Sequence, residues 1–207
     1  MLGFVKNTIR NILFTLVTVA VSAGTIFGQS KTNLEVLFGL MNKEAAALSP
    51  QLQSDNAKLF IDYSSPNDLR IFKNRFVTEL DKYCNGITTV QSEAGTILDF
   101  TLEKTGVKYT DTFRDGLFGD YLVERESTIG GSYNISKNGS VTVSDSFNLS
   151  QVDTVKYDEI SSLENHSLPF TRNEVPDEPF FSSLIEPVIA IGSAVVAVLL
   201  FFTIRSK

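Results

Sequence analysis

Two long apolar segments enclose a polar middle, and this arrangement restricts the fold more than any other feature of the sequence. Residues 12–23 form an apolar run that follows Lys6 and Arg10, the only charged residues among the first 29. A cationic start, a short apolar core and small residues after it are typical of a secretory signal peptide. We therefore predict a signal peptide over residues 1–29, with an uncleaved amino-terminal anchor as the alternative.

The second apolar segment predicts a transmembrane helix over residues 184–204. No charged residue lies between Pro187 and Ile204, and a helix of about 20 residues spans the roughly 30 Å of a hydrocarbon core. Arg205 and Lys207 follow directly, and cations beside a span mark its cytoplasmic side. The sequence thus predicts a single-pass protein with membrane lipid as a partner of this helix; a buried core helix is the alternative.

The end of the first segment indicates the source of the protein. Residues 26–30 resemble the end of signal peptides from Gram-negative bacteria of the Bacteroidota type, which often stop at glutamine. The resemblance implies a bacterial inner-membrane protein, with the bulk of the chain in the periplasm and residues 205–207 in the cytoplasm. A eukaryotic type I surface protein is the alternative, because four sites match the N-glycosylation pattern: Asn134, Asn138, Asn148 and Asn165.

The middle of the chain is acidic, which excludes one class of partner. Residues 30–185 carry a net charge of −9, and an acidic domain repels phosphate backbones, so no nucleic acid is expected. A lone cysteine, Cys84, cannot form an internal disulfide. With His166 as the single histidine, the chain lacks the usual ligands of a metal cluster. We therefore expect no metal and no cofactor.

The hydrophobic pattern of the middle predicts an α+β domain over residues 30–160. Apolar residues at helical spacing predict helices over 32–49 and 65–83, the first with a Thr32–Glu35 capping box and an end at Pro50. Short runs predict strands near 58–63 and 87–91. Alternating apolar and polar residues predict strands near 96–109, 121–135 and 140–149, the last two joined by an Asn138–Gly139 turn. The expected fold is two helices packed on a mixed or antiparallel sheet of about five strands, plus the transmembrane helix.

The proline-containing range 161–183 predicts an extended stalk between this domain and the membrane. Packing of its apolar residues on the domain is the alternative. The element order of residues 32–149 resembles the small periplasmic α/β modules of the curli-secretion lipoprotein, of lipoprotein activators of peptidoglycan synthases, and of the amino-terminal domain of the Tol–Pal propeller protein. This resemblance implies a binding or assembly domain rather than an enzyme.

No catalytic constellation stands out in the sequence, so we expect a membrane-anchored, non-enzymatic envelope protein whose periplasmic domain binds a protein or a cell-wall component. The alternative is an envelope hydrolase that uses two carboxylates as acid and base. Several carboxylates lie near Arg114 and Arg125, and we interpret them as solvated charges: Asp115, Asp120, Glu124 and Glu126.

Residues 111–120 are the candidate partner-binding site. This range interrupts two predicted strands and carries Phe113, Leu117 and Phe118 beside Arg114. Apolar residues in a connecting loop indicate a contact surface when the loop is exposed. The alternative is that the loop folds back onto the core.

Overall fold

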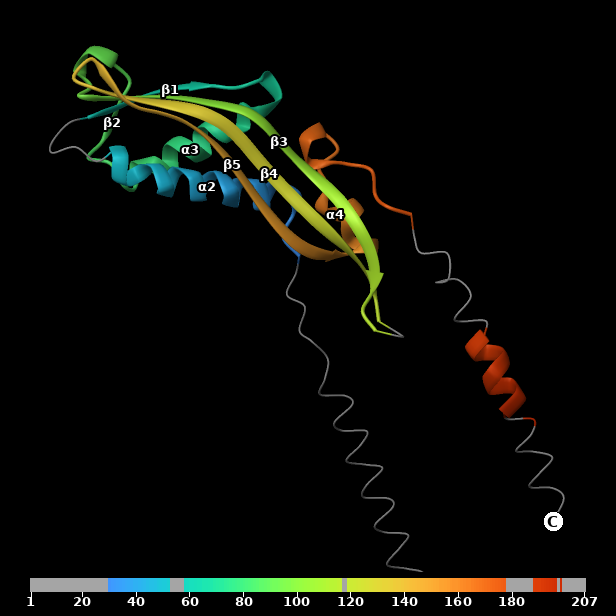
Figure 1. Ribbon diagram of the computed structural model, residues 1–207. Helices are drawn as coiled ribbons and strands as arrows, with labels where there is room; N and C mark the ends of the chain where they lie inside the picture. Colours follow the sequence, from blue (N-terminus) through green and yellow to red (C-terminus); the bar gives the residue numbers. More distant parts are fainter. Residues whose placement is uncertain (1–29, 53–57, 117–118, 178–187, 197, 199–207) are drawn as a thin grey trace, which may run out of the picture. The chain divides into compact units, whose positions relative to one another are not determined.

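The sheet at the centre of the protein has five strands in the order β2-β1-β3-β4-β5 and curls into a half-barrel beside helix α2 (Figure 1). The computed structural model describes residues 30–52, 58–116, 119–177, 188–196 and 198. The chain divides into residues 1–30 and 31–207, and the second unit holds the sheet and the helices that cover it. β1 (Leu59–Ser64) pairs in parallel with β2 (Ile87–Thr88) and with β3 (Thr96–Arg114).

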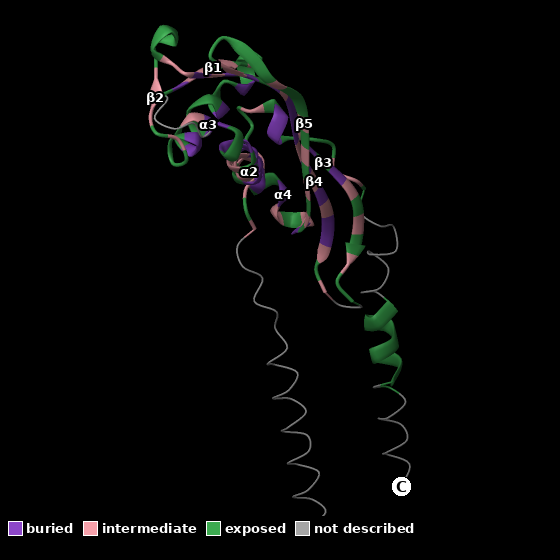
Figure 2. Cartoon of the chain, turned by 60° about the vertical axis from the view of Figure 1, so that its left-hand side comes forward, coloured by how far each residue is buried: buried purple, intermediate pink, exposed green. Residues whose placement is uncertain are grey.

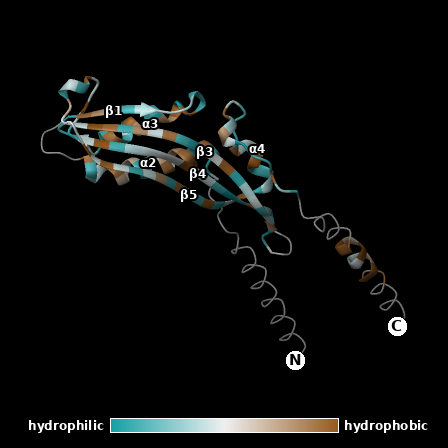
Figure 3. Ribbon diagram, turned by 45° about the horizontal axis from the view of Figure 1, so that its top comes forward, coloured by the Kyte–Doolittle hydropathy of each residue, from teal (hydrophilic) through white to brown (hydrophobic). Residues whose placement is uncertain are grey.

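The long strands β3, β4 (Tyr121–Lys137) and β5 (Ser140–Lys156) form an antiparallel meander. The predicted turn between β4 and β5 is confirmed: Asn138 has φ 51° and Gly139 has φ 78°. Positive φ at both central residues is the geometry of the two-residue turn that matches the twist of paired strands. Hydropathy alternates along all three strands (Figure 3), so one side of the sheet is apolar.

Helix α2 (Asn33–Leu52) begins at the predicted capping box. Thr32 N–H donates to Glu35 Oε2 at 2.8 Å, and Glu35 N–H donates to the Thr32 hydroxyl at 3.3 Å. The helix continues past Pro50, where the sequence predicts its end. Proline has no N–H, so Pro50 cannot donate to the carbonyl of Ala46, four residues earlier. The Ser49 hydroxyl donates to this carbonyl instead, at 2.8 Å, and the helix continues.

The core lies between the apolar side of the sheet and the helices α2 and α3 (Ile71–Asp81), which follows η1 (Asn67–Leu69). Buried residues concentrate on β3, β4 and the facing sides of these helices (Figure 2). Aromatic rings continue the core across the sheet: Phe76 stacks on Phe100 at 4.0 Å between centroids, and Phe100 stacks on Phe147 at 5.1 Å. Phe147 reaches Phe100 across Gly131, where an added Cβ would lie 3.0 Å from the Phe147 ring.

Residues 157–171 also pack on this core. They form η3 (Tyr157–Glu159), α4 (Ile160–Leu163) and η4 (Pro169–Thr171). A further 3₁₀ helix, η2 (Gln91–Glu93), lies between β2 and β3. Ile160, Leu163 and Phe170 are buried, and the Phe170 ring lies 5.6 Å from that of Phe72. Part of the range predicted as a stalk therefore covers the domain.

The structure corrects the fold class expected from the sequence. The described residues contain four helices rather than two packed helices and a transmembrane helix: α2, α3, α4 and residues 188–196. The mixed sheet is curled rather than a layer beneath two helices. Local periodicity cannot reveal this curvature, because it depends on the twist between neighbouring strands, and local sequence does not show which strands pair.

The predicted transmembrane helix over 184–204 is wrong. Among the helices that the structure describes, none is both long and apolar enough to cross a membrane; residues 184–187, 197 and 199–204 lie outside the described part. The same finding contradicts the lipid partner, the single-pass topology, and the inner-membrane placement with residues 205–207 in the cytoplasm, since each depended on that helix. The predicted signal peptide, residues 1–29, lies outside the described residues.

Candidate functional site

One edge of the sheet is formed by β5, a long strand whose residues are mostly exposed. β5 comes last in the strand order and pairs with β4 alone in the described structure. Its 17 residues are mostly exposed, with Val141 and Val152 among the exposed large apolar residues (Figure 2). An edge strand presents a row of unpaired N–H and C=O groups, which is a template for another strand.

The direction of these backbone groups follows from Ser146. Its N–H donates to Asp145 Oδ1 at 2.8 Å, which places this N–H on the open side of the strand. The hydroxyl of Thr142 donates to Ile135 O at 3.0 Å, so the carbonyl of Ile135 points toward β5. N–H groups of successive residues point to opposite sides of an antiparallel strand. Asn148 and Ser150 therefore direct their N–H groups to the open edge.

Side chains on the concave side of β5 form an apolar shelf along this edge. We define the β5 shelf as Val143, Phe147 and Leu149, which are half-buried and pack against the core. They alternate with exposed polar residues of the convex side, such as Ser144 and Asn148. A strand added beside β5 would bury the remaining exposed surface of the shelf.

The negative charge of an exposed carboxylate, Asp145, acts on a buried one, Glu44, near the shelf. Glu44 of α2 is 5 % exposed, and burial raises the pKa of its carboxyl group, with the charge of Asp145 as a second cause. Asp145 is exposed on β5, on the same side of the sheet as its partner Tyr133 of β4. The site therefore holds negative charge beside apolar surface.

A buried polar network fixes the other half of β5. Arg125 of β4 is 1 % exposed and binds Asp153 of β5 with two bonds, Nε to Oδ1 at 2.8 Å and Nη2 to Oδ2 at 2.6 Å. Its Nη1 donates to Lys31 O at 2.8 Å and to Asn33 Oδ1 at 2.7 Å. Asn33 in turn donates to the Tyr109 hydroxyl at 2.8 Å. These bonds tie the start of α2 to three strands and hold the edge in place.

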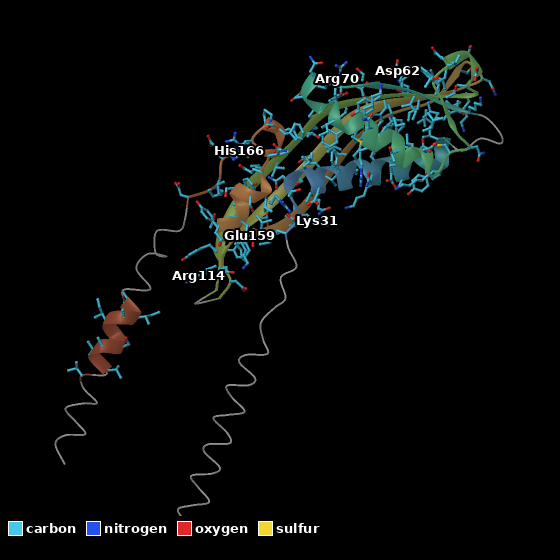
Figure 4. All side chains as sticks on the ribbon, turned by 180° about the vertical axis from the view of Figure 1, so that it is seen from behind. Lys31, Asp62, Arg70, Arg114, Glu159 and His166 are labelled. Carbon is cyan, nitrogen blue, oxygen red and sulfur yellow. The ribbon has the colours of Figure 1, made fainter. Side chains whose placement is uncertain are left out.

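The predicted partner-binding residues lie at the far end of the β3–β4 hairpin, away from Asp62 of β1 (Figure 4). Phe113 is 43 % exposed, as a contact residue would be. Arg114 lies over the Tyr121 ring at 5.1 Å and donates to Gly119 O at 3.0 Å. Leu117 and Phe118 lie outside the described residues. The structure thus leaves this site as a prediction and does not join it to the β5 shelf.

Two surface hollows were candidates for a substrate site. One, of about 610 Å³, is lined by Lys108, Tyr109 and residues 173–177; the other, of about 410 Å³, lies between α2 and α3 beside Phe38 and Arg75. Neither hollow includes Glu44 or Asp145. Burial, and next the charge of Asp81, raises the pKa of the Cys84 thiol, which disfavours the reactive thiolate.

Both buried charges of this region fall on faces that the sequence pattern already marks as apolar. Glu44 lies in the helical stripe of Leu37, Met41 and Leu48. Arg125 shares the alternation of Val123, Ile129, Tyr133 and Ile135 on β4, although we did not place it on a buried face from the sequence. A charged residue in phase with an apolar face is the signal that identifies both.

No protein-family model matches the chain, and no curated protein matches it. Among solved structures, the chain is similar to a protein described as a homolog of the neuraminyllactose-binding hemagglutinin from Helicobacter pylori. The two share 9 % sequence identity with a TM-score of 0.31, over 49 % of this chain and 68 % of the other. A likeness at this level says nothing about what the chain binds or catalyses.

Proposed function

We propose that this chain is a non-enzymatic binding module that takes up an extended segment of a partner protein as a new strand along β5. The observation that carries the proposal is the open edge of β5, a terminal strand of 17 residues with an apolar shelf on its concave side. Strand addition of this kind obtains affinity from main-chain hydrogen bonds and specificity from alternate side chains.

Contacts with the core hold β5 in an ordered conformation before any partner binds. The Arg125–Asp153 bonds and the Phe100–Phe147 stacking join β5 to the core at two separate points. A strand that is already ordered loses little conformational freedom when a second strand pairs with it, which favours binding. The hydrolase alternative has less support, because Glu44 and Asp145 line neither surface hollow.

The edge also carries features that discourage indiscriminate pairing. The register between β4 and β5 shifts at Ile135 and Ser136, which leaves Thr142 as an extra residue on β5. The Asp145 carboxylate accepts a hydrogen bond from the N–H of Ser146, so this N–H is not available to another strand. Bulges and charges are the usual protection of an exposed edge strand. The unprotected part is therefore short, from residue 147 onward, and lies beside the shelf.

The test uses the complete 207-residue chain and, as the probe, a neutral synthetic peptide of about ten residues in which valine and threonine alternate. Hydrogen exchange resolved to single amides should slow at Asn148 and Ser150 when the peptide is added, because their N–H groups point to the open edge. Asn148→Pro should abolish this protection, since proline removes an open-edge N–H without removing a bond to β4. Asn148→Thr keeps the N–H and serves as the matched control.

Circular dichroism first establishes that both variants fold, and Ser150→Pro replaces Asn148→Pro if the latter does not. Protection at β5 in the parent and the threonine control, lost in the proline variant, supports strand addition. Protection confined to other strands, or peptide binding equal in the proline variant and its control, would overturn the proposal.

A further inference from the structure

Helix α2 carries a buried carboxylate that has no counter-charge among the described residues. Glu44 lies in the middle of the buried stripe of α2, and it has no hydrogen bond or ion pair within the described residues. An ionised carboxylate removed from water is costly unless a donor or a cation compensates it. In the network behind β5, by contrast, the buried charge of Arg125 has its partners.

Asp145 adds a second negative charge on the same side of the sheet. It is exposed, it accepts a bond from the N–H of its neighbour Ser146, and the described structure shows no cation paired with it. The other charged residues of β5 are paired: Asp153 with Arg125 at 2.6 Å and Lys156 with Asp120 at 2.7 Å.

The cation nearest in sequence does not compensate Glu44. Lys43 precedes it on α2, but its Nζ donates to Gln151 Oε1 of β5 at 3.1 Å. This bond directs the Lys43 ammonium group toward the end of β5 that carries Asp153. The stretch of edge near Asp145 is left with uncompensated negative charge next to the apolar β5 shelf.

We infer that the segment that pairs with β5 carries a lysine or arginine whose charged group binds the carboxylates of Asp145 and Glu44. Apolar residues on either side of this cation cover the β5 shelf. The inference rests on the proposed function and names the chemistry of the partner. Alternation places every second side chain of an added strand on the concave side, where a cation meets the carboxylates and apolar neighbours meet Phe147 and Leu149. Charge complementarity of this kind sets partner choice and register.

The experiment compares two forms of the valine–threonine peptide, one with lysine and one with glutamine at the same central position. Fluorescence anisotropy with the complete chain measures the dissociation constants, and amide exchange at Asn148 and Ser150 reports where each peptide binds. We expect the lysine peptide to bind roughly tenfold more tightly, the size of one charge-assisted hydrogen bond. The double variant Glu44→Gln/Asp145→Asn should remove this preference.

Asp99→Asn is the matched control, because Asp99 is exposed and lies on β3 between the buried Leu98 and Phe100, hence on the convex side. The lysine preference should survive in this variant. Equal binding of both peptides at β5 overturns the cation inference and leaves strand addition standing. A lysine preference that persists in the double variant also overturns it. Failure of both peptides to protect β5 overturns the proposed function itself.

Discussion

Removal of the Asp153 carboxylate should destabilise the domain by about 3 kcal/mol. Arg125 is 1 % exposed, and Asp153→Ala takes away two bonds to its guanidinium, at 2.8 and 2.6 Å. A hydrogen bond to a charged group contributes about 1.5–3 kcal/mol, so two of them amount to roughly 3–6 kcal/mol. The Asp153 side chain is 32 % exposed, and water can partly replace it, which places the expected loss at the lower end.

Urea denaturation followed by circular dichroism measures this loss as a change in the free energy of unfolding. The double variant Arg125→Met/Asp153→Ala should be more stable than the sum of the two single losses predicts, by about 1.5 kcal/mol or more, because it no longer buries an unpaired guanidinium. Asp62→Ala, an exposed change on β1, should stay within about 0.5 kcal/mol of the parent. A loss below about 1 kcal/mol for Asp153→Ala, or strict additivity in the double variant, would refute this account of the network.

Three further changes test other parts of the structure. Gly131→Ala should cost about 3 kcal/mol in urea denaturation, because its Cβ would collide with the Thr101 carbonyl of β3 and lie 3.0 Å from the Phe147 ring; a near-neutral result would contradict this close packing around Gly131. Phe170→Ala should cost about 3–5 kcal/mol in the same assay, whereas Phe113→Ala, at an exposed residue, should stay near zero. Glu44→Gln should stabilise the protein at pH 7, since the raised pKa means that folding disfavours the ionised carboxyl group. This advantage should shrink as the pH falls through the raised pKa toward the ordinary value of 4.5, so thermal unfolding at a series of pH values would contradict the reasoning if the difference stayed constant.

Local patterns in the sequence identify most elements because their causes are local. The capping box of Thr32 and Glu35 forms through residues three apart, and the Asn138–Gly139 turn needs only two residues that accept positive φ. Where a compensating group lies nearby, as Ser49 does beside Pro50, the pattern misplaces the end of a helix. For residues 184–204 the pattern predicted too much rather than too little. Their apolar composition predicted a membrane-spanning helix, and no described helix is long and apolar enough to be one.

The candidate site shows the limit of the same reasoning. Alternation over residues 140–149 predicts a strand but cannot say that β5 is the last strand of the sheet, because strand order depends on which distant segments pair. The sequence places Phe113 in an interrupting loop, whereas the structure places it in β3, paired with Leu122 and with an exposed side chain. The sequence does not reveal, however, that the charge of Asp145 contributes to the raised pKa of Glu44, although the two residues lie far apart along the chain.

The sequence by itself determined which way most side chains face along their own strand or helix, since the periods of about 2.0 and 3.6 residues are properties of the backbone alone. The bulge at Thr142 is an exception, because it leaves Val141 exposed although Val143 is half-buried. For this reason Glu44 and Arg125 are in phase with the apolar residues of their own elements. Only the tertiary structure decided what meets them there: Arg125 meets Asp153 and Asn33, whereas Glu44 meets no partner among the described residues. The cost or gain of a buried charge depends on its neighbours in space, and the packing of the α2 helix against a curled sheet selects those neighbours.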